Sequence, residues 1–381
     1  MGRPVCPGAR RQAIGTPSIA FGSRMRTTGT LSIALALALP AAGRATSLSD
    51  ELGVGTSQTT PINPRSGYLY DRITGVFDLA DPLSLRLEAI GTHDFATSPQ
   101  HGAHFQLVGR EIFSASAGLD WEVSDHVFLY GEGFFSPTST SSSDAPVPFG
   151  PTNQADALIN ATSSVHGFLA KVGYDTAGDS DYETMVDGSL SLVHYSSRQS
   201  VTAVETDSGP VDIQSVIDSC NLTQQGGCDE YVNAATRQGV ELNQYRASAS
   251  VTETIHQTDL SLGGAYYWYD HDPTTLGYFS LATVGRSFAT SSGLPSLAPL
   301  RYTVRPGLGR SFGAMRVDLW YQYGRYVIHE EQSHGAGLKL QYRFGRAFSA
   351  WLRLDAQDDF DRQQNDTTVS ALIVIGLRGR F

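Results

Sequence analysis

The stretch "TTVSALIVIGLRGRF", residues 367–381, decides the fold. From Val369 to Leu377 every second residue is apolar, while the positions between them are mostly small or polar, with Leu372 and Val374 as interruptions. A period of two is typical of a β-strand that has one apolar and one polar face. The segment is therefore predicted to pair into a sheet, and Phe381 continues its apolar series.

The same alternation recurs along most of the chain. "PLSLRLEA" (82–89) and "GLKLQYRF" (337–344) both place apolar side chains on one face and polar or charged ones on the other. Most such segments run about ten to fourteen residues, roughly double the usual strand of a soluble sheet. No helical period competes with them, so an all-β protein is predicted. About fourteen segments are found, beginning near residues 67, 83, 111, 126, 164, 184, 243, 258, 276, 300, 315, 335, 347 and 368.

Two architectures suit long strands with two unlike faces. A soluble sandwich would bury the apolar faces, whereas a transmembrane barrel would turn them toward lipid. The segment lengths match the roughly 9–11 residues of a spanning strand. Terse connections such as "SDH" (124–126) alternate with extended ones, and aromatic residues cluster near segment ends, which is typical of interfacial girdles. We expect a single transmembrane antiparallel up-and-down β-barrel, with fourteen strands as the best estimate and about 12–16 as the range.

The front of the chain is predicted to be a secretory signal peptide, residues 1–45. "MRTTGTLSIALALALPAAGRA" (25–45) has a basic start, an apolar run and a small-residue exit, and Met25 is an alternative start. The apolar run is about half as long as a membrane-spanning helix. Residues 46–66 are then a periplasmic segment or the first strand, and 67–381 form the barrel. Its large surface loops are expected at about 136–162 and 197–240.

The signal segment, the alternating strands and the final "ALIVIGLRGRF" together resemble Gram-negative outer-membrane β-barrel proteins of the porin type. In that family the last strand commonly ends in an aromatic residue, usually Phe, which the β-barrel assembly machinery reads as an insertion signal. The matching residues are Phe381, Leu377, Ile375 and Ile373, whereas Gly379 departs from the pattern. The resemblance implies a location in outer-membrane lipid, but it specifies no solute, subfamily or oligomeric state.

The expected strand count contains one conflict. Counting connections forward from residue 67 and backward from Phe381 assigns opposite sides of the membrane to the region between 270 and 300. A barrel of this type has an even number of strands. One strand must therefore have been missed or split, near 52–60 or 288–298.

Composition and cysteine use narrow the remaining possibilities. A net charge of −11 argues against a nucleic-acid partner, which would require a basic surface. Cys220 and Cys228, in an exported chain, are predicted to close a small disulfide loop. The alternative of a metal site lacks further ligands nearby. No cofactor-binding motif is found.

Charge on the polar faces points to a candidate pore. The C-terminal third supplies a basic wall to the lumen, against which stand two acids, Asp318 and Asp355. Earlier strands supply further acids: Glu88, Asp120, Glu122 and Glu132. Cationic side chains in a pore favour anions, but ion pairs across the lumen could instead prop or block the barrel, and both alternatives stay open. The residues of the predicted basic wall are Arg301, Arg305, Arg316, Lys339, Arg343, Arg353, Arg378 and Arg380.

The leading hypothesis is a passive outer-membrane channel for small polar or anionic solutes, and not an enzyme. The alternative is a surface structural or adhesion barrel with a blocked lumen. A hydrolase is a distant third, based on Asp270, His271 and Asp272 in "YDHDP", which is also an ordinary turn sequence. "HEEQSHG" (329–335) is read as an acidic surface loop rather than a cation site.

Overall fold

The structure is a computed structural model. It describes residues 45–60, 63–95, 110–149, 153–176, 182–206, 208–223, 232, 235–236, 239–271, 300–327, 332–361 and 366–380. The predicted signal segment, except Ala45, and Phe381 lie outside these ranges, so the structure does not test either prediction.

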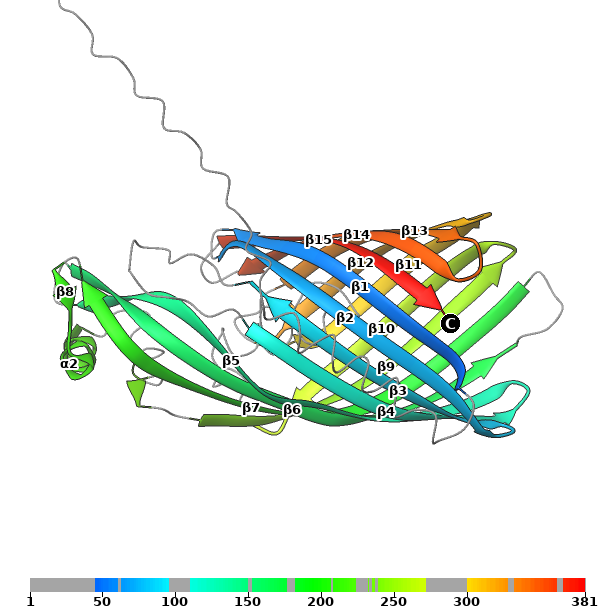
Figure 1. The fold of residues 1–381 in the computed structure, drawn as a ribbon, viewed down its shortest axis with the longest axis horizontal. Coiled ribbons are helices and arrows are strands. Elements are labelled where there is room, and N and C mark those ends of the chain that lie inside the picture. Colours follow the sequence, from blue (N-terminus) through cyan, green and yellow to red (C-terminus); the bar gives the residue numbers. More distant parts are fainter. Residues whose placement is uncertain are drawn as a thin grey trace, which may run out of the picture. The chain divides into compact units, whose positions relative to one another are not determined.

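The described chain from Ala45 onward forms one antiparallel β-sheet that closes on itself (Figure 1). Sequential strands are neighbours, β6 pairs with β7, and β1 pairs with β15, so the sheet has no open edge within the barrel. The strands are β1 (Ala45–Thr60), β2 (Asn63–Ala80), β3 (Leu83–Asp94), β4 (Arg110–Ser124), β5 (Val127–Phe149), β6 (Asn153–Asp175), β7 (Tyr182–Thr206), β8 (Gly209–Pro210), β9 (Gly239–Ile255), β10 (Thr258–Tyr269), β11 (Leu300–Phe312), β12 (Met315–Tyr326), β13 (Gln332–Phe344), β14 (Phe348–Asp361) and β15 (Asp366–Arg380).

Strand β8 has two residues and does not span the barrel. In the part of the chain that the structure describes, fourteen strands span it, which confirms the predicted fold class and strand number. The described helix α2 (Ile213–Thr223) was not predicted. Among the described residues, no helix is long and apolar enough to cross a membrane.

Side-chain exposure shows which face of the sheet points outward. On β15, Ile373, Ile375 and Leu377 are 46%, 56% and 61% exposed, whereas Leu372 and Val374, on the other face, are buried. The alternating apolar residues of the sequence therefore cover the outside of the barrel, and a soluble sandwich with a buried apolar face is excluded.

The conflict in the strand count involves two segments, one at each of the places between which the count had to be corrected. Residues 45–60 form β1, which pairs with β2 and β15 and belongs to the barrel. The strand predicted near residue 276 lies outside the described residues. When β1 is counted and the segment near 276 is not, the strands number fourteen, and the connections at 81–82, 125–126, 256–257, 313–314 and 345–347 lie at the same end of the barrel. This end, where β1 begins and β15 ends, is here called the turn end. The opposite end is the loop end.

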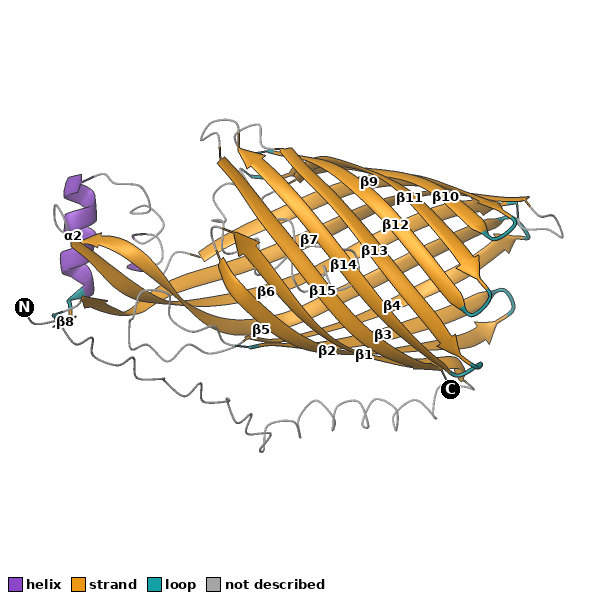
Figure 2. Cartoon of the chain, turned by 90° about the horizontal axis from the view of Figure 1, so that it is seen from above, coloured by secondary structure: helices purple, strands orange, loops and turns teal. Residues whose placement is uncertain are grey.

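Surface loops were expected at 136–162 and 197–240, but strands occupy most of the first range and the start of the second, residues 197–206. The structure continues β5 and β6 through Phe149 and Asn153, and β7 reaches Thr206, so three strands project beyond their neighbours at the loop end as an arm (Figure 2). The register between β4 and β5 ends at Phe135, so β5 is an edge strand within the arm. An edge strand tolerates Pro146 and Pro148, because a missing N–H there breaks no ladder bond.

A small hydrophobic core stabilises the arm. Val216 and Cys220 of α2 are buried at 0% and 2% exposure against Val147, Ala157 and Val204 of the arm strands. Cys220 is disulfide-bonded, and Cys228 lies outside the described residues. Helix α2 thus covers the face of the arm that continues the inner face of the barrel.

Candidate functional site

The barrel interior brings together part of the predicted basic wall. Arg305, Arg316, Lys339, Arg353 and Arg378 lie on inward positions of the consecutive strands β11 to β15 and are intermediate or buried in exposure. Register explains why they meet: Lys339 of β13 stands opposite Asp318 of β12 on one side and Arg353 of β14 on the other. These five residues are called the inner basic wall below.

The other three predicted cations are exposed at strand ends. Arg301 lies beside the first residue of β11, at the loop end. Arg343 and Arg380 lie near the turn end, where Arg380 stands opposite Ser49 of β1. These positions place them at the rims of the barrel rather than on the inner basic wall.

Two cations of the inner basic wall are neutralised by carboxylates. Arg353 donates to Asp355 through Nε at 2.7 Å and through Nη2 at 3.3 Å, and their side chains are 11% and 4% exposed. Arg316 donates from Nη2 to Asp259 at 2.6 Å and from Nε to Asp318 at 2.8 Å. Ion pairs of this kind hold the wall together and reduce its net charge.

Two other cations of the inner basic wall are not neutralised by a carboxylate of the described residues. Lys339 Nζ lies 5.2 Å from the centre of the Trp351 ring, and Arg378 Nη2 donates to Ser49 Oγ at 3.3 Å. In the described part of the chain neither side chain forms an ion pair. The inner basic wall therefore carries positive charge that its carboxylates do not cancel.

Aromatic rings and glycines shape the same wall. Two guanidinium groups lie near the Trp320 ring, with the Cζ atoms of Arg305 and Arg353 at 5.0 Å and 5.2 Å from its centre. Trp320 stands opposite Gly337, where any Cβ would overlap the indole ring. Glycine at this position lets the indole lie flat against the backbone, so it stacks with the cations and leaves the lumen wider.

The predicted acids lie across strands β3 to β5. Glu88 forms ion pairs with Arg72 at 3.9 Å and Arg86 at 3.7 Å, and Thr74 Oγ1 donates a hydrogen bond to its carboxylate at 3.3 Å. Asp120, Glu122 and Glu132 occupy inward positions of β4 and β5, where Glu122 is exposed close to the turn end. The two sides of the lumen thus carry opposite charge.

Several interior charges were missed by the sequence analysis. Glu51 and Arg72 approach to 3.9 Å across β1 and β2, and Lys171 and Asp187 to 3.4 Å across β6 and β7. Each occupies an inward position of an alternating strand, so the same period of two would have found them. Their partners depend on register, which the alternation does not give.

The candidate hydrolase residues form a structural contact. Asp270 accepts hydrogen bonds from the backbone N–H of Asn243 at 2.9 Å and from its side chain at 2.6 Å, and His271 Nδ1 lies 3.0 Å away. Desolvation raises the pKa of Asp270, but these hydrogen bonds outweigh it and lower the pKa to about 2. A carboxylate this acidic is a poor general base near neutral pH. Asp272 and residues 329–331 lie outside the described residues, and among those described no cluster of metal-ligating side chains is found.

A closed fourteen-strand barrel with an apolar exterior and a charged interior defines the class of outer-membrane β-barrels. No protein-family model and no curated protein sequence matches the chain. The structure is similar to the CymD monoaromatic hydrocarbon channel, with a TM-score of 0.50 and 7% identity, over 89% of this chain and 88% of that chain.

Two further structures are similar at lower scores. A Pseudomonas aeruginosa FadL homologue has a TM-score of 0.47 and 11% identity over 88% of this chain and 90% of that chain. Acinetobacter baumannii OccAB1 has a TM-score of 0.40 and 11% identity over 89% and 99%. At such identities the likeness concerns the fold, which is that of Gram-negative outer-membrane β-barrel channels, as the sequence resemblance predicted.

Proposed function

We propose that this chain is a passive outer-membrane channel for small solutes, with a preference for anionic or polar ones. The observation that carries the proposal is the uncancelled positive charge of Lys339 and Arg378 inside a closed barrel. Cationic side chains in a pore lower the electrostatic energy of a passing anion. The likeness to solved channels supports transport and does not identify the solute.

The outer-membrane location belongs to the same proposal. The exposed apolar side chains, among them Leu190, Leu262 and Ile375, would contact acyl chains, because exposing so much apolar surface to water is unfavourable. We infer that residues 1–45 direct export, and that the assembly machinery reads Phe381 with the apolar positions before it. Deleting Phe381 should reduce insertion in cells, while refolding from urea into detergent should proceed.

Conductance across a planar bilayer tests the channel. Purified protein should give stepwise currents, and a salt gradient should produce a reversal potential of the sign expected for anion preference. Lys339→Glu should shift that potential toward cations. Arg310→Glu is the matched control, because Arg310 is exposed on the outer face near Phe312 and should leave selectivity unchanged.

Two results would count against the proposal in different ways. Absence of current at every voltage would reject the channel. Current with the same reversal potential in Lys339→Glu would keep the channel and reject the anion preference.

The arm favours a second candidate, a surface interaction barrel. Strands β5 to β7 have 23, 23 and 25 residues, and α2 packs on them through the buried core around Val216. A folded projection of this kind can present a binding surface while the lumen stays closed. If the intact protein conducts no ions but loses attachment to a surface when the arm is shortened, this candidate replaces the channel.

A further inference from the structure

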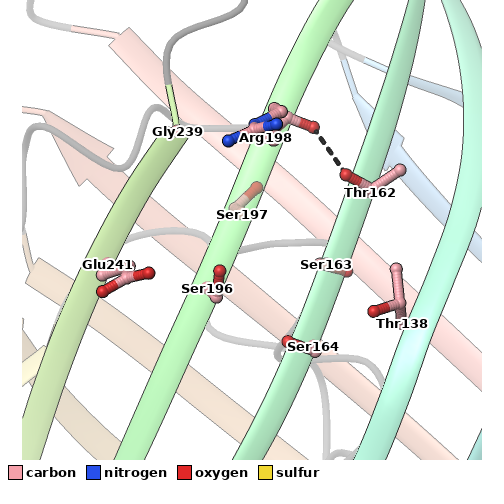
Figure 3. Close-up of a pocket in the computed structure, with 9 residues that line it drawn as sticks. All are labelled: Thr138, Thr162, Ser163, Ser164, Ser196, Ser197, Arg198, Gly239 and Glu241. Carbon is pink, nitrogen blue, oxygen red and sulfur yellow. Dashed lines mark hydrogen bonds between the residues drawn. The ribbon is translucent and has the colours of Figure 1, made fainter.

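An outward-facing pocket lies on the loop-end half of the barrel, on the opposite face of the sheet from the lumen. It has a volume of about 520 Å³ and spans four neighbouring strands, β5, β6, β7 and β9 (Figure 3). Serine and threonine residues line most of it, together with Arg198 and Glu241. The hydroxyl groups of Thr162, Ser164 and Ser196 face outward, whereas Ser163 and Ser197 are buried on the other face. We call it the outer pocket.

Register places the outer pocket on the outer face of the sheet. Ser196 of β7 stands opposite Ser164 of β6 and Glu241 of β9, and Arg198 stands opposite Thr162 and Gly239. Ser196 and Arg198 follow Leu190 and Leu192 at intervals of two residues, and no register shift occurs between Leu190 and Arg198 in either pairing. Because Leu190 and Leu192 are 61% and 41% exposed on the outside, the outer pocket faces outward as well.

The rows of outward residues change character in a fixed order toward the loop end. The first row is aromatic and apolar, with Tyr245 and Trp268 stacked at 5.8 Å between ring centres. The second row holds His166 and His194, with ring centres 4.7 Å apart, and Asn243, whose Oδ1 accepts a hydrogen bond from His194 Nδ1 at 2.9 Å. The outer pocket begins with the third row. Aromatic side chains mark the edge of the hydrocarbon core, so the polar rows lie above it.

The height of the outer pocket can be estimated from strand geometry. Ser196 is separated from Leu192 by four residues, or roughly 13 Å along the strand. With a strand tilt of about 40°, this is roughly 10 Å along the membrane normal. A phospholipid headgroup region is only about 5–8 Å thick on each side. The outer pocket therefore lies at the level of sugars carried by a lipid rather than of simple headgroups.

The lining suits a sugar better than a bare phosphate. Hydroxyl groups donate and accept, as sugar hydroxyls do, while Arg198 and Glu241 offer charge-assisted donors and acceptors of opposite sign. In the described part of the chain neither makes an ion pair. The Arg198 guanidinium lies across Gly239, whose missing side chain leaves this space open: a Cβ there would be 3.5 Å from Nε. Thr162 Oγ1 donates to the Arg198 carbonyl at 3.3 Å and ties the two strands (Figure 3).

We propose that the outer pocket binds the saccharide headgroup of a glycolipid in the outer leaflet. This proposal rests on the outer-membrane location proposed above and not on conduction. The acyl chains of the lipid would lie against the apolar rows of β6 and β7, while its sugars reach the outer pocket. The lipid would then be held at one position on the barrel circumference.

Binding to purified full-length protein in detergent tests the proposal, by native mass spectrometry and by fluorescence titration. The probes are rough-type lipopolysaccharide, phosphatidylglycerol, and the core oligosaccharide freed from its lipid by mild acid. The double variant Arg198→Gln/Glu241→Gln should bind lipopolysaccharide about ten-fold or more weakly, the loss expected for charged hydrogen bonds. Ser196→Phe, which fills the outer pocket, should do the same. Arg310→Gln, exposed on the same face at the turn end, is the control and should bind normally.

The outcomes separate this proposal from the channel. Weaker lipopolysaccharide binding by both variants supports the glycolipid proposal. If the wild type conducts ions, the variants should show the same single-channel conductance; if it conducts none, the binding result still supports the glycolipid proposal. Equal binding by wild type and variants overturns it. Equal affinity for phosphatidylglycerol, or for the freed oligosaccharide, also overturns it, because the ligand would then be a generic lipid or a soluble sugar. Unchanged heat-modifiable migration on gels shows that each variant is folded.

Discussion

Two interior ion pairs with the same local geometry should differ sharply in their contribution to stability. In each, an arginine donates through Nε to the aspartate two residues later, at 2.7 Å in Arg353–Asp355 and at 2.8 Å in Arg316–Asp318. Their surroundings differ, because the first pair is 11% and 4% exposed and the second 42% and 26%. Asp355→Asn should leave a buried, uncompensated guanidinium and cost about 3–5 kcal/mol.

Asp318→Asn is the matched control. Its arginine stays partly solvated and retains Asp259 at 2.6 Å, so the expected cost is about 0.2–1 kcal/mol. Replacing both members of the buried pair, as Arg353→Met/Asp355→Leu, should restore most of the stability, because no unpaired charge is then left.

Equilibrium unfolding in urea, with the protein in lipid vesicles and tryptophan fluorescence as the signal, measures these differences. Equal losses for Asp355→Asn and Asp318→Asn would refute the reasoning, because burial would then not determine the cost. A double variant as unstable as Asp355→Asn would show that packing around Trp320, and not charge, dominates.

The remaining predictions concern the exterior, the arm and the loop end. Ile375→Arg should destabilise the barrel by about 2–4 kcal/mol in the same urea assay, because Ile375 is 56% exposed on the lipid-facing side. Ser189→Lys on the inner face should cost much less, and equal costs would contradict the assignment of faces. Val216→Asp, at 0% exposure, should detach α2, so limited proteolysis should cut residues 213–223 while the barrel survives; an uncut helix would argue against this core. The pKa of Asp270 is lowered to about 2, so its contacts with Asn243 should be complete above about pH 4 and lost as the pH falls through about 2. Protection of the Asn243 amide from hydrogen exchange, relative to Asp270→Asn, should show this pH step, and equal protection in both proteins at every pH would contradict it.

The alternation of apolar and polar residues was sufficient to predict most of the barrel. Strand β14 illustrates why: Leu352 and Leu354 point outward, while Arg353 and Asp355, between them, are buried inside. The sequence has a period of two because successive residues of a strand face lipid and the lumen in turn, and these surroundings require apolar and polar side chains respectively.

Strand β1 was harder to recognise from its sequence. "ATSLSDELGVGTSQTT" places Gly53 and Gly55 on its inner face, where the rings of Tyr70 and Tyr68 cover them. Glycine is depleted in strands, so the sequence left residues 46–66 as either a periplasmic segment or the first strand. In the structure, glycine is what lets these tyrosines pack against the backbone.

The arm was missed for a different reason. "SPTSTSSSDAPVPF" has the serine and proline content of a loop, yet Val147 is buried and Pro146 lies at an edge where no hydrogen bond is lost. Contacts such as Arg316 with Asp259 join residues 57 apart in sequence. Such contacts depend on strand register, which composition and alternation do not determine.

The central claim is that the apolar faces contact acyl chains and the polar faces surround the lumen. Spin labels at Ser189, Leu190, Ser191 and Leu192, one at a time in the protein reconstituted into lipid vesicles, test it most directly. Labels at 190 and 192 should collide mostly with dissolved oxygen, which concentrates in lipid, and labels at 189 and 191 mostly with a water-soluble nickel complex. Equal access of both reagents to all four positions, or the reverse alternation, would contradict the account.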